Sequence, residues 1–537
     1  MSGAVAGCHY AAAVREIRVV EVMAALSLTT DLATGVPFEK GLQVCLVADR
    51  LADELGLDAP TRAAVFQASL LRSIGCTSHA PENAEEFVDD TAFQAALKRL
   101  DPGDPETFAG QLRDFGRWAG PGSDLAARFL EIAPTVGPVA AASGCEVSRA
   151  LAPELGAGER VLRALDEVYE RWDGLGIPLG RSGEELGVEA RVLHVAEQAV
   201  LARAGGAPGA ARQELVRRAG GHLDPEIARV AVAAGAGLLQ PLDAADLLSE
   251  VLAREPAPVA VVAGDAAPRL CRVLGTVADL KSTHLLGHSS FVARVATAAG
   301  QRAGLATATL DDLACAALLH NLGCVVVPSS VLDCRPAELG VAGRERMRLQ
   351  GYWTQRILER CPSLSDLAPL VRGASEHHAS FAEGGYLDWR RSADLLPPVA
   401  LPEAGRLLEA AEAYASLAEP RPGREALPGA EIGARLEAAA RDGRLDPGAV
   451  DAVREVAAVA PAVGSSRSAL LTAREVQVLG LAARGLTNRA IAQRLGISDR
   501  TVGHHLAHVY DKTGRRTRAG VAVWAVERGL LPRTGLP

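Results

Sequence analysis

KGLQVCLVADRLADELGL (residues 40–57) and HSSFVARVATAAGQRAGL (residues 288–305) can be laid over each other at an offset of 248 residues. The same offset, without a gap, lays SLLRSIGC (residues 69–76) over ALLHNLGC (residues 317–324). Apolar residues recur in these segments at i, i+3, i+4 and i+7, which is the pattern of an amphipathic helix. An offset that persists over two separate segments indicates that the body of the chain is a duplicated, all-helical bundle.

Two further pairs of segments continue the duplication. Residues 190–202 match residues 405–418, and residues 221–230 resemble residues 443–453, at a smaller offset, so the first copy carries extra residues. Pro- and Ala-rich residues 252–268 and small residues 460–468 interrupt the helical pattern. We therefore predict an all-α chain with helical bundles at residues 14–245 and 269–458, followed by a small domain at residues 466–537.

Composition agrees with packed helices in a reducing compartment. Hydrophobic residues make up 48% of the 537 residues but aromatic residues only 4%, so the cores must consist mainly of Ala, Leu and Val. The nine cysteines include no CxxC pair, which favours free thiols over a zinc ribbon or a disulfide scaffold. We found no apolar run of membrane-spanning length and no signal peptide, so we expect a cytoplasmic protein without a membrane partner.

Charge is divided unevenly along the chain. The net charge is −9, yet residues 465–537 contain 12 Arg and Lys against 4 Asp and Glu, an excess of eight positive charges. The remainder therefore carries −17. An acidic body with a basic tail is typical of a regulator whose tail meets a polyanion.

The tail contains the signals of a helix-turn-helix. In LTAREVQVLGLAARGLTNRAIAQRLGISDRTVGHHLAHVYDKTG (residues 471–514), Thr472 followed by Glu475 forms a capping box. The segment GIS supplies a tight turn, and Ser498 caps a second helix that is rich in polar residues. Along its whole length the tail resembles the LuxR/FixJ/GerE-type DNA-binding domain, which implies double-stranded DNA as partner and a homodimer formed through the helix at residues 518–528.

The same resemblance implies a set of DNA-contacting residues. Four residues of the recognition helix would face base edges: Gly503, His504, Ala507 and His508. Six residues are placed for phosphates: Thr487, Asn488, Arg489, Arg500, Thr501 and Lys512. Many members of this family have longer or basic side chains where Gly503 and Ala507 stand, so base readout would depend on the two histidines.

The second repeat resembles the HD-GYP domains, which are helical, metal-dependent phosphodiesterases that cleave cyclic di-GMP. The segments that carry the resemblance are HLLGHSSFVARVA, LLHNLGCVVVP and EHHASFAEGGY, at residues 284–296, 318–328 and 376–386. Four metal-ligand positions keep histidine: His288, His320, His377 and His378. Three are altered: Asn321 stands for the bridging Asp, Gln350 for a His, and Glu412 for a later Asp, still able to offer an oxygen ligand.

The first repeat departs from the HD-GYP pattern in another way. It has Arg72 and Ser73 where the His-Asp pair belongs, and Val168 and Tyr169 where the paired histidines belong. It keeps the loop sequence Gly-Ile-Pro at residues 176–178, for which a simple tight turn is the favoured interpretation. We expect no metal site in this repeat.

Two functions stay open. The favoured one is a DNA-binding transcriptional regulator whose tandem HD-GYP-like body senses a small-molecule or nucleotide effector or mediates dimerisation, with at most one divalent ion (Fe or Mn) in the second repeat. The alternative is a metal-dependent phosphodiesterase for cyclic di-GMP or a related phosphoester that carries a DNA-binding tail. The sequence favours the regulator without catalysis because the tail motif is intact while the catalytic set is broken.

Overall fold

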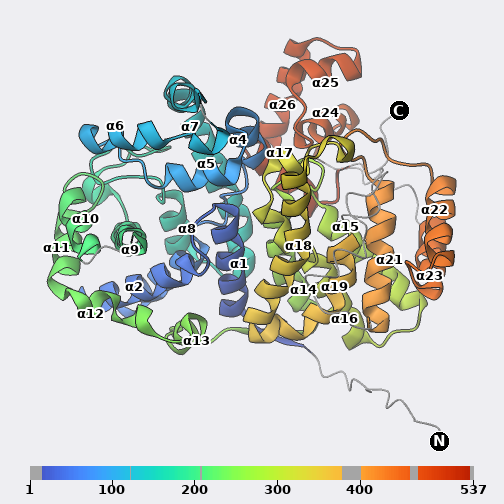
Figure 1. The fold of residues 1–537 in the computed structure, drawn as a ribbon, viewed down its shortest axis with the longest axis horizontal. Helices are drawn as coiled ribbons and strands as arrows, with labels where there is room; N and C mark the ends of the chain where they lie inside the picture. Colours follow the sequence, from blue (N-terminus) through green and yellow to red (C-terminus); the bar gives the residue numbers. More distant parts are fainter. Residues whose placement is uncertain (1–14, 121, 206–208, 378–400, 460–469, 532–537) are drawn as a thin grey trace, which may run out of the picture.

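The computed structural model describes residues 15–120, 122–205, 209–377, 401–459 and 470–531, and it is built almost entirely of helices (Figure 1). The two repeats lie side by side, and the C-terminal domain sits against both of them at one end. The expected all-α architecture, two duplicated HD-type bundles followed by a small helical domain, is confirmed.

The duplication is visible in the helix boundaries. Helices α2 (Lys40–Glu54) and α3 (Ala59–Leu71) become α15 (His288–Arg302) and α16 (Thr307–Leu319) when 248 is added to each residue number. Helix α1 (Val19–Ala33) likewise begins 248 residues before α14 (Ala267–Asp279). The repeats therefore share one register through their first three helices.

Beyond these helices the first repeat carries extra structure. An aromatic cluster formed by Phe87, Phe93 and Phe115 packs its additional helices together. The remaining helices of this repeat are α4 (Ala80–Phe87), α5 (Asp90–Leu97), α6 (Pro105–Asp114), α7 (Leu125–Leu151), α8 (Glu159–Asp166), α9 (Val188–Ala204), α10 (Ala210–Arg218), α11 (Pro225–Ala234), α12 (Ala236–Leu239) and α13 (Leu247–Ala253).

The second repeat is completed by the 3₁₀ turn η6 and by further α-helices. In the described residues these are η6 (Leu322–Val326), α17 (Ser329–Leu332), α18 (Val341–Arg360), α19 (Ala368–His377), α21 (Glu403–Ala418), α22 (Gly429–Arg441) and α23 (Pro447–Val459). One hydrophobic core of mainly Ala, Leu and Val runs through both repeats, as the composition predicts. Burial of this shared apolar surface stabilises the repeats against each other.

A two-stranded antiparallel sheet joins the beginning of the body to the segment between the repeats. Strand β1 (Glu16–Arg18) pairs with β2 (Val261–Ala263), with Ile17 opposite Val262. Ile17 is fully buried, so this short pairing also closes the end of the core.

Two stretches are long and apolar enough to be candidates for a membrane span. In Thr307–Val326, 72% of the most apolar 18-residue window is buried, which is the environment of a core helix. Leu125–Leu155 is only 11% buried, and it contains Pro134 and Pro138 within α7. Both stretches qualify by length and composition only, which is weak evidence for a membrane span, so the sequence-based expectation is not overturned.

The tail forms four helices: α24 (Ala473–Ala483), α25 (Asn488–Leu495), α26 (Asp499–Thr513) and α27 (Arg518–Glu527). The predicted capping box between Thr472 and Glu475 is confirmed, and Ser498 caps α26 by accepting from the Thr501 N–H at 3.1 Å. Two small apolar clusters of its own hold the tail together. The helix-turn-helix therefore has a self-contained core.

Candidate metal centre and nucleic-acid interface

Three buried side chains of the second repeat converge inside the bundle. His288 is the first residue of α15, His320 follows α16, and Glu412 lies in the middle of α21. Glu412 Oε2 lies 2.9 Å from His288 Nε2 and 3.2 Å from His320 Nε2. Two imidazoles and a carboxylate whose ligand atoms lie within 4.8 Å of one another form a set that suits one divalent metal ion.

The outer nitrogens of both imidazoles are already engaged. His288 Nδ1 donates to Glu419 Oε2 at 2.6 Å, and His320 Nδ1 donates to the Ala317 carbonyl at 2.7 Å. Both Nε2 atoms are thereby turned toward Glu412. Metal-binding histidines are oriented in this way, with the far ring nitrogen bonded to a carboxylate or carbonyl, so the residues present fit an ion.

Charge in this centre favours a bound cation. Burial lowers the pKa of His288, but Glu412 and Glu419 outweigh burial and raise the pKa to about 9. At neutral pH the imidazolium therefore lies between the two glutamates. A divalent ion would displace the Nε2 proton and would meet the same carboxylate.

Asp279, at the end of α14, is a member of this region that the sequence analysis did not single out. It accepts from the Ser289 backbone N–H at 2.9 Å and from the Ser289 hydroxyl at 2.7 Å. Burial raises the pKa of Asp279 to about 6, against the opposing effect of His288. Asp279 holds the first turn of α15, and with it His288, in place.

The altered positions are also buried. Asn321 is 2% exposed, and within the described residues its side-chain Nδ2 has no hydrogen-bond partner. Gln350, in α18, makes a weak 3.8 Å contact from Nε2 to the Met347 sulfur. A Cβ atom on Gly323 would lie 1.9 Å from the Gln350 carbonyl oxygen, so only glycine lets α18 pass this close to the turn after His320.

Of the paired histidines, His377 is the last residue of α19, whose backbone alone is described there. His378 lies outside the described residues. Their proposed part in the metal site stays a prediction.

The first repeat replaces the metal-ligand positions with fixed cations. Lys40 and Arg72 stand 248 residues before His288 and His320, and both form buried ion pairs with Glu197, which aligns with Glu412. The negative charge of Glu197 is thus offset by an ammonium and a guanidinium. Burial raises the pKa of Glu197, but Arg72 and Lys40 outweigh it and hold the pKa well below its ordinary value.

The loop at residues 176–178 of this repeat is a tight turn that hydrogen bonds to a nearby carboxylate hold in place. The Glu170 carboxylate accepts from the backbone N–H of Leu179 at 2.6 Å and from that of Arg181 at 3.1 Å. Tyr169 remains beside it, with 39% of its surface exposed. Intramolecular bonds therefore account for the loop's shape.

In the tail, α26 offers the face expected of a recognition helix. His504, Ala507 and His508 are exposed, while Thr501 and Gly503 are half-buried on the same helix. Val502 and Leu506 point the other way, into the tail's core. Side chains that could meet base edges thus lie together on one outer face.

Some of the residues placed for phosphates are exposed, whereas others are bonded within the tail. Thr487, Arg489 and Arg500 are exposed around the N-termini of α25 and α26. The Asn488 side-chain oxygen accepts from Arg518 Nη2 at 2.8 Å, and Lys512 Nζ donates to Glu475 Oε2 at 2.7 Å. Sequence reasoning did not foresee these two internal contacts.

Helix α27, where the resemblance places the dimer contact, packs against α7 of the first repeat. Ala519 and Val523 of α27 belong to the core cluster of the body. At the start of the helix, Glu146 of α7 accepts from the backbone N–H of Arg516 at 2.6 Å and of Thr517 at 2.9 Å. In this conformation the body covers part of the helix that would pair two tails.

Comparisons with known proteins agree with both parts. Residues 469–525 match the family described as bacterial regulatory proteins, luxR family, and residues 144–227 and 272–448 match the HD domain family. The chain therefore carries a LuxR-type DNA-binding domain after a body that contains HD-domain segments.

Individual relatives resemble one part or the other. The chain is 25% identical over 425 residues to 3'3'-cGAMP-specific phosphodiesterase 3 of Vibrio cholerae, covering 76% of this chain and 88% of the relative. A crystal structure of a V. cholerae cyclic GMP-AMP specific phosphodiesterase (V-cGAP3) has the same fold, with a TM-score of 0.56 and 20% identity over 83% of this chain and 99% of that one. Transcriptional regulatory protein YdfI of Bacillus subtilis is 43% identical over 61 residues, which are 11% of this chain and 29% of that protein.

Proposed function

We propose that this protein is a cytoplasmic, homodimeric transcriptional regulator whose HD-type body responds to a small molecule or a metal ion without hydrolysing a cyclic dinucleotide. The observation that carries the proposal is the contrast between an intact, exposed recognition face on α26 and a metal centre with only three converging ligands in the described residues. His504 and His508 would read bases, and Arg489 and Arg500 would bind phosphates.

The proposed metal is a single iron or manganese ion held by His288, His320 and Glu412, with His377 and His378 as further candidates. Such an ion would supply a positive charge that ties α15, α16 and α21 together. Hydrolysis by two metal ions needs a bridging carboxylate, and a neutral amide at Asn321 cannot offset the charge of two close dications. Loss of the second ion removes the bridging activation of the nucleophile.

The test is selection of DNA sequences by the full-length protein, followed by binding measurements on the selected site. Specific binding that is weakened in Arg500→Ala supports the proposal, and failure to enrich any sequence overturns it. Metal content measured by mass spectrometry on wild type and His320→Ala tests the single-ion site separately.

A second candidate function is phosphodiesterase activity, which the likeness to a 3'3'-cGAMP-specific phosphodiesterase over most of its length favours. It is tested by incubating the protein with manganese or iron and either 3'3'-cGAMP or cyclic di-GMP, followed by chromatography. Turnover at ordinary enzyme rates that is lost in His320→Ala would replace the proposal above. Activity gained only in Asn321→Asp combined with Gln350→His would show a decayed catalytic site.

A further inference from the structure

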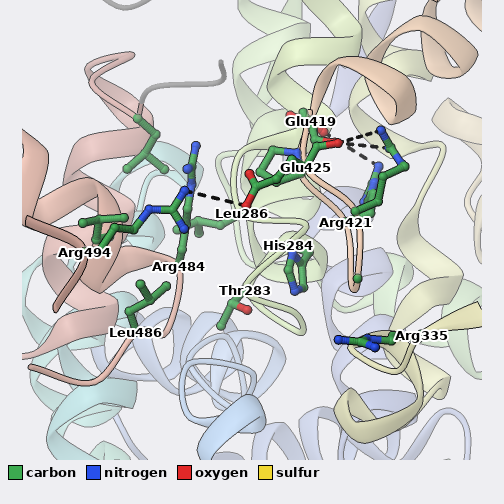
Figure 2. A pocket seen from close by; sticks show the side chains of 15 residues that line it. Thr283, His284, Leu286, Arg335, Glu419, Arg421, Glu425, Arg484, Leu486 and Arg494 are labelled. Carbon is green, nitrogen blue, oxygen red and sulfur yellow. Dashed lines mark hydrogen bonds and ion pairs between the residues drawn. The ribbon is translucent and has the colours of Figure 1, made fainter. Parts of the chain in front are cut away.

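A cavity of about 390 Å³ lies between the second repeat and the tail (Figure 2). One wall comes from the loop before α15 and the loop after α21, and the other from α24 and α25 of the helix-turn-helix. The volume is within the range of small-molecule sites, which also tend to form at interfaces between domains.

Positive charge gathers around this cavity. Five arginines line it, three from the body and two from the tail, together with two glutamates. The arginines are Arg335, Arg421, Arg424, Arg484 and Arg494, and the glutamates are Glu419 and Glu425. Both glutamates are engaged, since Glu419 bonds His288 and Glu425 lies 3.7 Å from Arg494. Glu419 also lies 3.7 Å from Arg421, so five arginines against two glutamates leave an excess of three positive charges around the cavity, which an anionic ligand would offset.

The body arginines are held in place before any ligand arrives. Residues 421–424, Arg-Pro-Gly-Arg, form a tight turn in which the Arg421 N–H donates to the Arg424 carbonyl at 2.8 Å and the reverse bond measures 2.9 Å. Gly423 has a φ of +74°, which this turn requires. Arg421 Nη2 is steadied by the Ser416 hydroxyl at 3.1 Å. The Arg424 guanidinium donates to the Leu417 and Ser416 carbonyls, so Arg421 is the preorganised group, and a group held in this way loses little side-chain entropy on binding.

The rest of the lining is apolar or neutral. Leu286 of the body and Leu481, Leu486 and Leu531 of the tail line the cavity beside the arginines. His284 also lines it; burial first, and then the nearby Arg421, lower the pKa of His284 to about 4, so its imidazole is neutral. A ligand here meets positive charge on one side and hydrocarbon on the other.

We propose that this interdomain arginine pocket binds a small organic phosphate, with the phosphate groups on Arg421, Arg484 and Arg494 and an apolar ring against the leucines. Arginine recognises phosphate through charge-assisted, often bidentate, hydrogen bonds. This inference deepens the proposed function because it gives the effector a site and a chemical class.

The position of the pocket links three parts of the molecule. The tail supplies Arg484 and Arg494, so an anion shared with Arg421 holds the tail against the body. Glu419 both lines the pocket and bonds the metal-centre residue His288, so an occupant also lies next to that centre. Because binding free energies are reciprocal, a ligand that favours the docked tail weakens DNA binding wherever DNA requires the undocked form.

The experiment uses the full-length protein, without added divalent metal, and measures binding by calorimetry with two probes, adenosine 5'-diphosphate and inorganic pyrophosphate. We expect adenosine 5'-diphosphate to bind more tightly than pyrophosphate because only the former reaches the leucines. Arg484→Gln and Arg494→Gln should each weaken it about ten-fold or more. The matched control is Arg302→Gln, an exposed arginine of the second repeat that pairs with Glu455 outside the pocket lining, and its binding should stay within two-fold of wild type.

Three results would overturn the pocket assignment. These are no binding of either probe by the wild type at millimolar concentration, equal binding by wild type and the Arg484 and Arg494 variants, or loss of binding in His320→Ala, which would move the ligand to the metal centre. DNA binding measured on the same samples separates the two proposals. If DNA binding is intact but no nucleotide binds, only the pocket proposal is refuted. If nucleotide binds but DNA does not, only the proposed regulator function is refuted.

Discussion

Replacing Glu146 with alanine is expected to loosen the tail from the body and to strengthen DNA binding. The Glu146 carboxylate accepts from two backbone N–H groups and from the Thr517 hydroxyl, at 2.6 Å, at the N-terminus of α27. Free N–H groups and the helix macrodipole make this end of a helix favourable for an anion. Alanine removes the charge and all three acceptor contacts at once.

The size of the effect follows from those contacts. A hydrogen bond to a charged group contributes about 1.5–3 kcal/mol, but the three bonds share one carboxylate, and the released N–H groups can bond water. A total of about 2–3 kcal/mol is therefore reasonable for the docking contribution of Glu146. If the docked tail cannot pair through α27, that energy appears as a DNA affinity about 30- to 150-fold higher.

The assay is fluorescence anisotropy with a labelled, selected DNA site at one fixed salt concentration. Full-length wild type, Glu146→Ala and the isolated tail (residues 466–537) are compared, with the isolated tail setting the upper limit. Glu131→Ala is the matched control, because Glu131 lies on the same helix and pairs with Arg128 of the first repeat. Equal affinity of the isolated tail and the full-length protein would refute the reasoning, because docking would then restrain nothing.

Three further predictions concern DNA contact, the ion cluster of the first repeat and the cap of the tail. Arg500→Ala should weaken binding to all DNA sequences and lower the salt dependence by a log–log slope of about 0.9, whereas His504→Ala should mainly reduce discrimination between sites; titrations at several salt concentrations check both. Arg72→Ala should lower the free energy of unfolding of the body by about 3–5 kcal/mol, measured by denaturant with a chelator present, because the buried Glu197 loses one of its cations. Lys98→Ala is the control and should cost much less, because Lys98 Nζ lies 3.8 Å from Glu197 Oε1 and the lysine is partly exposed. Burial raises the pKa of Glu475, but Lys512 and Thr472 outweigh burial and lower it to about 2, so its stabilising effect is present above about pH 4.5 and is lost as the pH falls toward 2. Glu475→Gln should therefore lower the free energy of unfolding of the tail by about 1–2 kcal/mol at pH 7, and the difference from wild type should disappear by pH 2. A difference that does not change with pH would contradict the stabilising role of the Glu475 carboxylate.

Much of the architecture could be predicted because it depends on local patterns. The 248-residue offset already placed Lys40 over His288 and Arg72 over His320, and the second aligned pair placed Glu197 over Glu412. The exchange of metal ligands for an ion cluster was therefore readable in the sequence. The ion cluster was not predicted because only Arg72 was compared with its ligand position, while Lys40 and Glu197 were not.

Other features depend on contacts that no pattern encodes. Glu146 and Thr517 are 371 residues apart, and nothing in either segment indicates that a carboxylate of α7 meets the start of α27. The arginine pocket likewise needs the Arg421 turn and α25 to be brought together by domain docking. Helix capping and apolar periodicity act within a few residues, whereas these contacts arise only once separate cores pack together.

The side-chain cations at Lys40 and Arg72 affect how the two repeats would respond to loss of a metal ion. If the second repeat holds the proposed ion, a chelator would remove it, whereas the ammonium of Lys40 and the guanidinium of Arg72 belong to the chain and would stay. The charge balance at Glu197 would therefore not depend on the metal supply, and loss of the proposed ion would change the charge only in the second repeat, beside the Arg421 turn that faces the tail. With the proposed ion bound, the duplicated body would combine one copy whose central charges do not depend on metal with one copy whose central charges do.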